Sequence, residues 1–155
     1  MDSMLIPLAI ATFVAASGDN FVAQVPVPFD DDAVEIEDVR LVSQDAIGED
    51  TTDYISFNVY GNDGSTVIFT RSTQDDGDAD GSGDLAADTP EKLTAQNGSA
   101  NYFYSQGVDS AAAAVQAARY ILFKVEGSGA GQALATGATI LVTLRKVSLV
   151  TEVVA

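Results

Sequence analysis

The sequence contains no cysteine, no histidine and no tryptophan, and it holds only seven Lys and Arg against 23 Asp and Glu in 155 residues. Without cysteine the chain forms no disulfide and offers no thiol nucleophile or thiolate metal ligand. Without histidine it lacks an imidazole base, and with it the Ser-His-Asp and Cys-His catalytic pairs. We therefore expect a protein that is not an enzyme and requires no cofactor.

The shortage of basic residues gives a formal net charge of −16. Nucleic acid and anionic membranes repel such a chain, so we expect neither as a partner. The charge is also uneven: residues 1–91 contain 20 acids and two bases, whereas residues 92–155 contain three acids and five bases. This asymmetry can draw copies of the protein together or orient it on a larger surface; the simpler interpretation is that solvated acids keep it soluble.

Hydrophobic residues make up 46% of the chain, which argues against a disordered acidic tail. Residues 1–155 suit a single domain with one core. Apolar alternation and β-branched runs, separated by turn signals, predict about eight strands. The predicted strands cover residues 4–16, 21–29, 34–42, 54–60, 65–73, 91–95, 119–126 and 138–147.

Few other segments depart from this strand pattern. Pro26 and Pro28 remove ladder donors and favour an edge strand for 21–29. The Ala-rich segment 109–118 predicts one short helix of about two turns. We therefore predict an all-β fold, an antiparallel β-sandwich that is jelly-roll-like, with at most one short helix.

The apolar run at residues 4–16 ends in small residues, as a signal-peptide core does. The only charge before it is Asp2, where such a peptide is basic, and Pro7 interrupts the run. We favour an extended N-terminal strand over residues 1–16, with a signal peptide as the alternative.

The acidic, low-complexity insertion at residues 74–89 has no composition that could build a core. It contains the pattern D-x-D-x-D-G-x-x-D, which is typical of the front of a calcium loop. The predicted Ca²⁺ ligands are Asp76, Asp78, Asp80, Asp84 and the backbone carbonyl of Ser82. Ala87 stands where a bidentate Glu belongs, so a solvated acidic insertion is the alternative.

Three apolar segments are candidates for contacts with other chains. The N-terminal strand and the apolar tail at 148–155 can pair with another chain's sheet edge, and aromatic side chains anchor interfaces. The alternative for the aromatic residues is a place in the core. The candidate interface residues are Leu5, Ile6, Leu8, Ile10, Tyr102, Phe103, Tyr104, Leu149, Val150 and Val153.

Basic residues lie on the last two strong strands, at Arg119, Lys124, Arg145 and Lys146. If they shared a face, they would form a basic strip able to meet the acidic half of a neighbouring copy. The alternative is ordinary solvated strand positions.

The order of segments resembles the small decoration (cement) proteins of tailed bacteriophage capsids, of the jelly-roll or β-sandwich kind. The resemblance rests on residues 6–10, 21–29, 36–42, 54–60, 120–129 and 138–144; the acidic insertion and the Ala-rich segment depart from it. It implies a protein of the virion's outer surface that binds the assembled head, often as a homotrimer, and clamps neighbouring subunits of the major capsid protein. An alternative is an adhesion module of a head or tail fibre that binds a host-surface glycan.

Overall fold

The computed structural model describes residues 3–26, 33–61, 64–77, 81–96, 102–104 and 120–147, with backbone alone at 26, 33–34, 102–104 and 146–147. These residues form ten strands and contain no helix. In the described ranges, then, no helix is long and apolar enough to cross a membrane. The predicted helix at 109–118 and the apolar tail at 148–155 lie outside the described residues.

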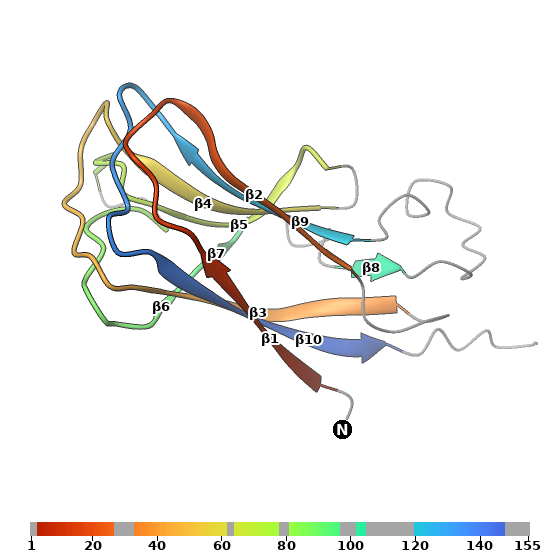
Figure 1. The fold of residues 1–155 in the computed structure, drawn as a ribbon. Helices are drawn as coiled ribbons and strands as arrows, with labels where there is room; N and C mark the ends of the chain where they lie inside the picture. The colour runs from red at the N-terminus through yellow and green to blue at the C-terminus, as the bar shows by residue number, and fades with distance from the viewer. Residues whose placement is uncertain are drawn as a thin grey trace, which may run out of the picture.

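The strands form two antiparallel sheets that lie one above the other (Figure 1). The first sheet has the order β1 (Ser3–Ile10), β10 (Ala138–Val147), β3 (Ala33–Ser43) and β6 (Glu91–Lys92), and β8 (Tyr102–Tyr104) also pairs with β3. The second has the order β2 (Gly18–Pro26), β9 (Tyr120–Gly127), β4 (Ile55–Tyr60), β5 (Val67–Ser72) and β7 (Thr94–Ala95).

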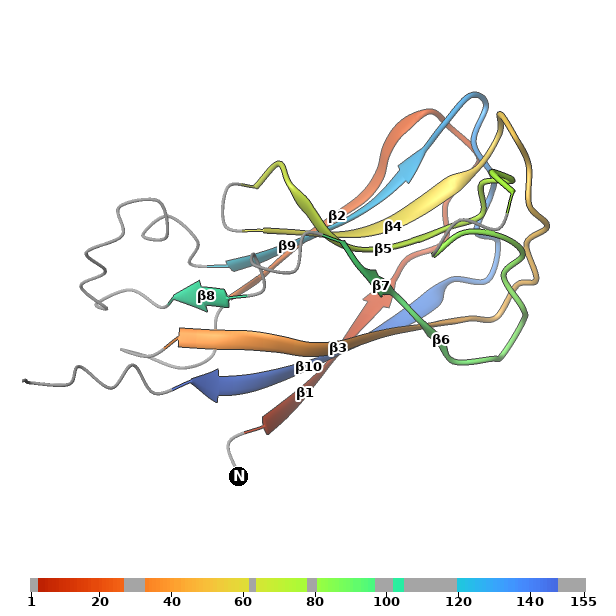
Figure 2. The same ribbon diagram turned by 180° about the vertical axis from the view of Figure 1, so that it is seen from behind.

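The strand order is that of a jelly roll. Strands from the first half of the chain alternate with strands from the second half, so that β10 lies between β1 and β3 while β9 lies between β2 and β4. Apart from the β4–β5 hairpin, the chain passes from one sheet to the other between successive strands of its first half, which wraps it around one core as a pair of Greek keys. The predicted fold class is confirmed, and Figure 2 shows the same layers from behind.

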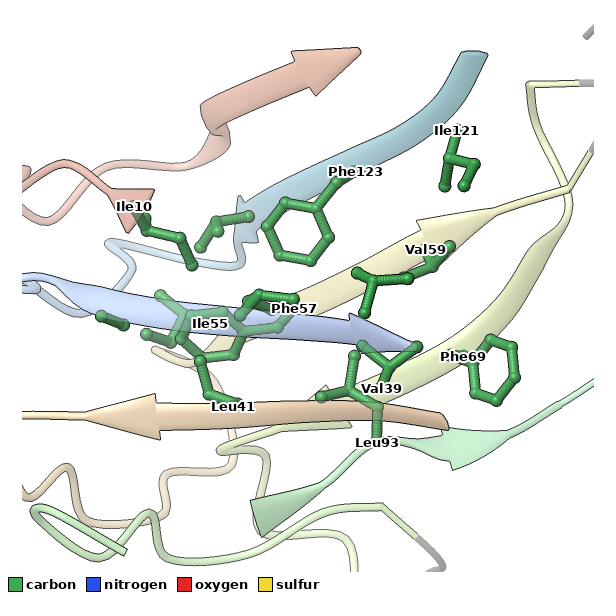
Figure 3. Packing of buried hydrophobic residues seen from close by; sticks show 14 of the residues in the cluster. Ile10, Val39, Leu41, Ile55, Phe57, Val59, Phe69, Leu93, Ile121 and Phe123 are labelled. Carbon is green, nitrogen blue, oxygen red and sulfur yellow. The ribbon is translucent and has the colours of Figure 1, made fainter. Parts of the chain in front are cut away.

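The core fills the space between the two sheets because each strand turns alternate side chains inward. Phe57 of β4 and Phe123 of β9 are the largest fully buried side chains. They face Val39 and Leu41 of β3 across the sandwich (Figure 3). Along β3, for example, Glu35, Glu37 and Arg40 lie outside the buried set formed by Ile36, Val39 and Leu41.

The strands β1 and β2, each at the edge of its sheet, both carry a proline. β1 contains Pro7 and ends the first sheet, and β2 ends in Pro26 at the edge of the second sheet. The predicted edge strand at 21–29 is confirmed for residues 21–26, and residues 27–29 lie outside the described residues. The predicted strand at 4–16 is too long, because β1 ends at Ile10 and only an isolated bridge between Phe13 and Leu134 follows.

The segment predicted as one strand at 91–95 belongs to both sheets. Glu91 and Lys92 pair with β3 in the first sheet, whereas Thr94 and Ala95 pair with β5 in the second. Leu93 lies between them and is fully buried. The chain therefore crosses from one sheet to the other at a single core residue.

Candidate functional site

Four connections meet at one end of the sandwich, at the left of Figure 1. They are residues 11–17, 44–54, 73–90 and 128–137, of which 78–80 are outside the described residues. We call this region the loop end. Its described acids are Asp45, Glu49, Asp50, Asp53, Asp75, Asp76, Asp84 and Asp88. Most of the protein's described negative charge outside the strands is therefore concentrated here.

Several of these acids fasten one loop to another. The Asp45 Oδ2 atom accepts a hydrogen bond of 2.8 Å from the backbone N–H of Thr136, and Asp53 Oδ1 accepts one of 2.7 Å from Ala130. Asp84 Oδ1 accepts one of 2.8 Å from the N–H of Glu49. A carboxylate that accepts backbone donors holds both the charge and the loop in place. The acids at the loop end therefore also form its framework.

Two of the carboxyl groups have lowered pKa values for this reason. The hydrogen bond from the Thr136 backbone lowers the pKa of the Asp45 carboxyl. Donors from the backbone of Asp53 and then of Thr52 lower the pKa of Asp50. Hydrogen bonds to the charged form favour that form, so both groups remain ionised at neutral pH.

Arg71 of β5 holds the acidic insertion against the sandwich. Its side chain is only 9% exposed and pairs with Glu91, at 2.6 Å between Nη2 and Oε2. Its guanidinium also donates to the carbonyl oxygens of Gly83, at 3.1 Å, and Asp84, at 2.5 Å. Glu91 in turn accepts the Ala86 N–H at 2.8 Å. This buried ion pair therefore binds backbone groups of the insertion at three successive contacts.

Sequence reasoning missed Arg71, although the strand period contains a signal for it. Arg71 stands opposite Phe57, and Phe69 stands opposite Val59. Both partners point into the core, so alternation along β5 places Arg71 on the inward face as well. An inward arginine at a strand end requires a buried partner, which Glu91 supplies.

The prediction that residues 74–89 cannot build a core is wrong at one position. Leu85 is 1% exposed and belongs to the core. It exchanges two backbone hydrogen bonds with Ile47, of 2.9 and 2.8 Å. The composition of an acidic segment does not reveal that one of its leucines is buried, yet Leu85 closes this end of the core.

The predicted calcium ligands are only partly described. Asp78 and Asp80 lie outside the described residues. Ser82 donates its hydroxyl to Asp76 Oδ1 at 2.5 Å, while Asp84 is bonded to Glu49. Among the described side chains no group of three or more acids is placed to hold a metal ion. Calcium binding stays a prediction.

The glycine-rich connection after β9 is a tightly packed turn. Gly131 has a φ of 69°, and a Cβ at Gly127 or Gly131 would overlap the carbonyl oxygen of Ala16. Phe13 and Leu134 exchange hydrogen bonds of 3.0 and 3.1 Å beside it. Glycine therefore permits the close approach of two backbones here.

The candidate interface residues fall into different environments. Leu5 is 58% exposed, and Ile6 and Leu8 are partly buried against the core. Ile10 is only 3% exposed, so it is a core residue and is not available for an interface. For Tyr102, Phe103 and Tyr104 only the backbone of β8 is described, and Leu149, Val150 and Val153 lie outside the described residues.

The predicted basic strip does not form from its described members. Lys124 is on β9 in the second sheet and Arg145 is on β10 in the first. Lys124 pairs with Asp19 at 3.0 Å, and Arg145 pairs with Glu35 and Glu37. Each base is thus neutralised by acids of the same chain. The side chains of Arg119 and Lys146 lie outside the description.

The outer face of the second sheet carries a polar network. Glu126 accepts hydrogen bonds from Tyr60 and, at 2.7 Å, from Asn58, which itself accepts the Thr70 hydroxyl at 2.7 Å. Burial raises the pKa of the Tyr60 hydroxyl, and the Glu126 carboxylate raises it further. Lys124 lies over the Tyr60 ring at 5.4 Å. These groups are bonded to one another, which does not favour a glycan site at this ring.

Comparison with known proteins identifies no family. No family model and no curated protein matches the chain. A solved structure of Maize Chlorotic Mottle Virus, determined by single-particle analysis, is similar at 15% sequence identity and a TM-score of 0.39. The similarity covers 96% of this chain and 95% of the other. At this TM-score the similarity establishes neither family nor function.

Proposed function

We propose that this protein is a virion structural protein, a decoration (cement) protein that binds the outer surface of the assembled head. It bridges and stabilises subunits of the major capsid protein, and it does so as a homotrimer. The resemblance in segment order suggested this function.

One observation of the molecule carries the proposal: an acidic loop end stands beside an edge strand that exposes apolar side chains. The acids gather at a loop end whose connections are bonded to one another. Met4 and Leu5, which are exposed at 37% and 58%, lie on the edge strand β1. Exposed apolar side chains mark protein contacts, and a dense acidic surface keeps a particle soluble. A decoration protein needs both.

Heads assembled without the protein test the proposal. Purified protein is added to them, bound and free protein are separated by sedimentation, and the melting of the heads is followed by calorimetry. We expect saturable binding at a fixed number of copies per capsid subunit and a higher melting temperature of the decorated heads. Heads that already carry the protein are the control, since their sites are filled.

Absence of binding, or binding without any gain in head stability, would contradict cementing. Binding to a glycan array together with failure to bind heads would instead favour the adhesion module. Light scattering of the free protein tests the homotrimer separately.

A further inference from the structure

Two adjoining segments of this acidic chain carry no charged residue at all. They are residues 3–17, which include β1, and residues 128–144, which include β10 as far as Leu144. The two strands pair along their length, from Ser3 opposite Arg145 to Ile10 opposite Ala138. Phe13 and Leu134 join the connections beyond them. We call this continuous surface the charge-free flank.

The flank exposes apolar groups both on its strands and on the connections beyond them. Alternation along β1 turns Leu5, Pro7 and Ala9 outward, and all three are exposed. At the loop end Val14 is 83% exposed beside an open hollow of about 330 Å³, which is lined by Thr12, Phe13, Val14, Ala133 and Ala135. Figure 1 shows the two connections together beyond β1 and β10.

The flank is suited to contact through its face more than through its strand edge. Pro7 has no N–H, and a proline in an edge strand interrupts the ladder that an added strand would form. Side-chain packing on the outer face of β1 and β10 needs no such ladder. Ala16 packs closely on Gly127 and Gly131 at the tip of the flank. Because this packing already fixes the tip, little conformational entropy is lost on binding.

Acids border the flank at its loop end. Asp45 and Asp53 bond to the backbone of its loop at Thr136 and Ala130. At the opposite end Glu37 accepts a hydrogen bond of 3.2 Å from Ser3, but it is also ion-paired with Arg145 at 3.4 Å, so the acidic part of the border lies at the loop end. An apolar centre with an acidic border fits a partner that is apolar at its centre and basic around it.

A second copy of this chain is a poor match for that border. Every base whose side chain is described is ion-paired within its own chain: Arg40, Arg71, Lys92, Lys124 and Arg145. A copy would also bring its own net charge of −16. The described bases of a copy are therefore already engaged, which favours a different protein as the source of the cations.

We propose that the charge-free flank docks onto a different protein, through a contact surface that is apolar at its centre and bordered by Lys and Arg. This inference builds on the proposed function, in which that protein is the capsid subunit. Association should slow as salt is added, because the acidic border then steers the encounter less.

Two flank variants and one matched control test the inference. Leu5→Glu and Val14→Glu place a carboxylate within the flank. Val22→Glu makes the same change in charge on β2, the edge strand of the other sheet, at a residue that is 49% exposed. All three positions are exposed, so we expect unchanged melting temperatures. On undecorated heads, we expect both flank variants to bind at least tenfold more weakly than the wild type and the control to bind normally.

The outcomes separate this inference from the proposed function. If the wild type binds heads and the flank variants bind equally well, the docking surface is wrong and the decoration function stands. If the wild type does not bind heads, the function fails, and the flank is judged on a resin whose ligand joins a benzyl group to a quaternary ammonium. Earlier elution of both flank variants than of Val22→Glu supports the flank, and coelution overturns it. Self-association of the wild type that Leu5→Glu abolishes would also overturn it.

Discussion

The ion pair between Arg71 and Glu91 makes a quantitative prediction about stability. Arg71→Met keeps most of the side-chain volume but removes the charge and the donors that reach Glu91, Gly83 and Asp84. Breaking a buried pair from one side costs about 3–5 kcal/mol, because a charge is left without its partner. Glu91 is 17% exposed and keeps the Ala86 N–H, so we expect the lower end, about 3 kcal/mol.

For a chain of this size, that loss corresponds to a fall of about 6–12 °C in melting temperature. Urea unfolding at pH 7, followed by far-UV circular dichroism, measures the free energy directly. The matched control is Arg40→Met, which breaks the pair with Asp38, where the arginine side chain is 53% exposed. We expect that change to cost less than about 1 kcal/mol, since exposed pairs are weak.

Equal losses in the two variants would refute the assignment of Arg71 as the anchor of the acidic insertion. A second test adds Glu91→Leu to Arg71→Met. Removing both partners of a buried pair relieves the unpaired charge, so we expect the double variant to recover part of the lost stability. Hydrogen exchange adds a local readout: the Leu85 amide should lose protection in Arg71→Met.

Four further results are expected. Leu85→Ala should cost about 3 kcal/mol of unfolding free energy in urea, because it opens a cavity in the core. Gly131→Ala should lower the melting temperature far more than Gly64→Ala: both glycines have a φ of 69°, but only Gly131 contacts Ala16. Urea titrations between pH 7 and 3 should show stability falling as pH drops through the lowered pKa of Asp45, since that carboxylate stabilises the fold only while ionised, and Asp45→Asn should reduce the fall. Calcium at millimolar concentration should raise the melting temperature of the wild type but not of Asp76→Asn, as read by calorimetry.

The controls for these results are of the same kind. Ala86→Gly beside Leu85 changes an exposed side chain and should have a much smaller effect. Equal effects at Gly131 and Gly64 would show that backbone contact with Ala16 is unimportant. A pH profile of Asp45→Asn that matches the wild type would contradict the loop tie to Thr136. No response to calcium or to a chelator would leave residues 74–89 as a solvated insertion.

Local pattern was sufficient for the strands that pack regularly. The last strand was predicted at 138–147 and is found at Ala138–Val147, because alternating β-branched residues there coincide with burial between two neighbours. The hairpin of β4 and β5 follows from its aromatic and β-branched arms around a glycine turn. Strand spacing predicted an antiparallel sandwich or barrel, and the number of strands favoured a jelly roll.

The loop end was harder to predict because its stability depends on residues far apart in sequence. Nothing near Leu85 signals that Ile47 will pair with it, and nothing near Arg71 signals Glu91. The role of the glycines at 127–131 also depends on Ala16, more than a hundred residues earlier in the chain. Composition described residues 74–89 only as an acidic insertion, whereas contacts between distant loops hold this segment in place.

The pairing of β1 with β10 has a consequence for how the protein is made. The first described strand completes its sheet only against the last described one, so this edge cannot form until β10 has left the ribosome. Folding that depends on such distant pairing is slow, and the facing edges of β1 and β3 have no strand between them until β10 arrives. The period of greatest risk of aggregation is therefore the interval between synthesis of the first strand and arrival of the last.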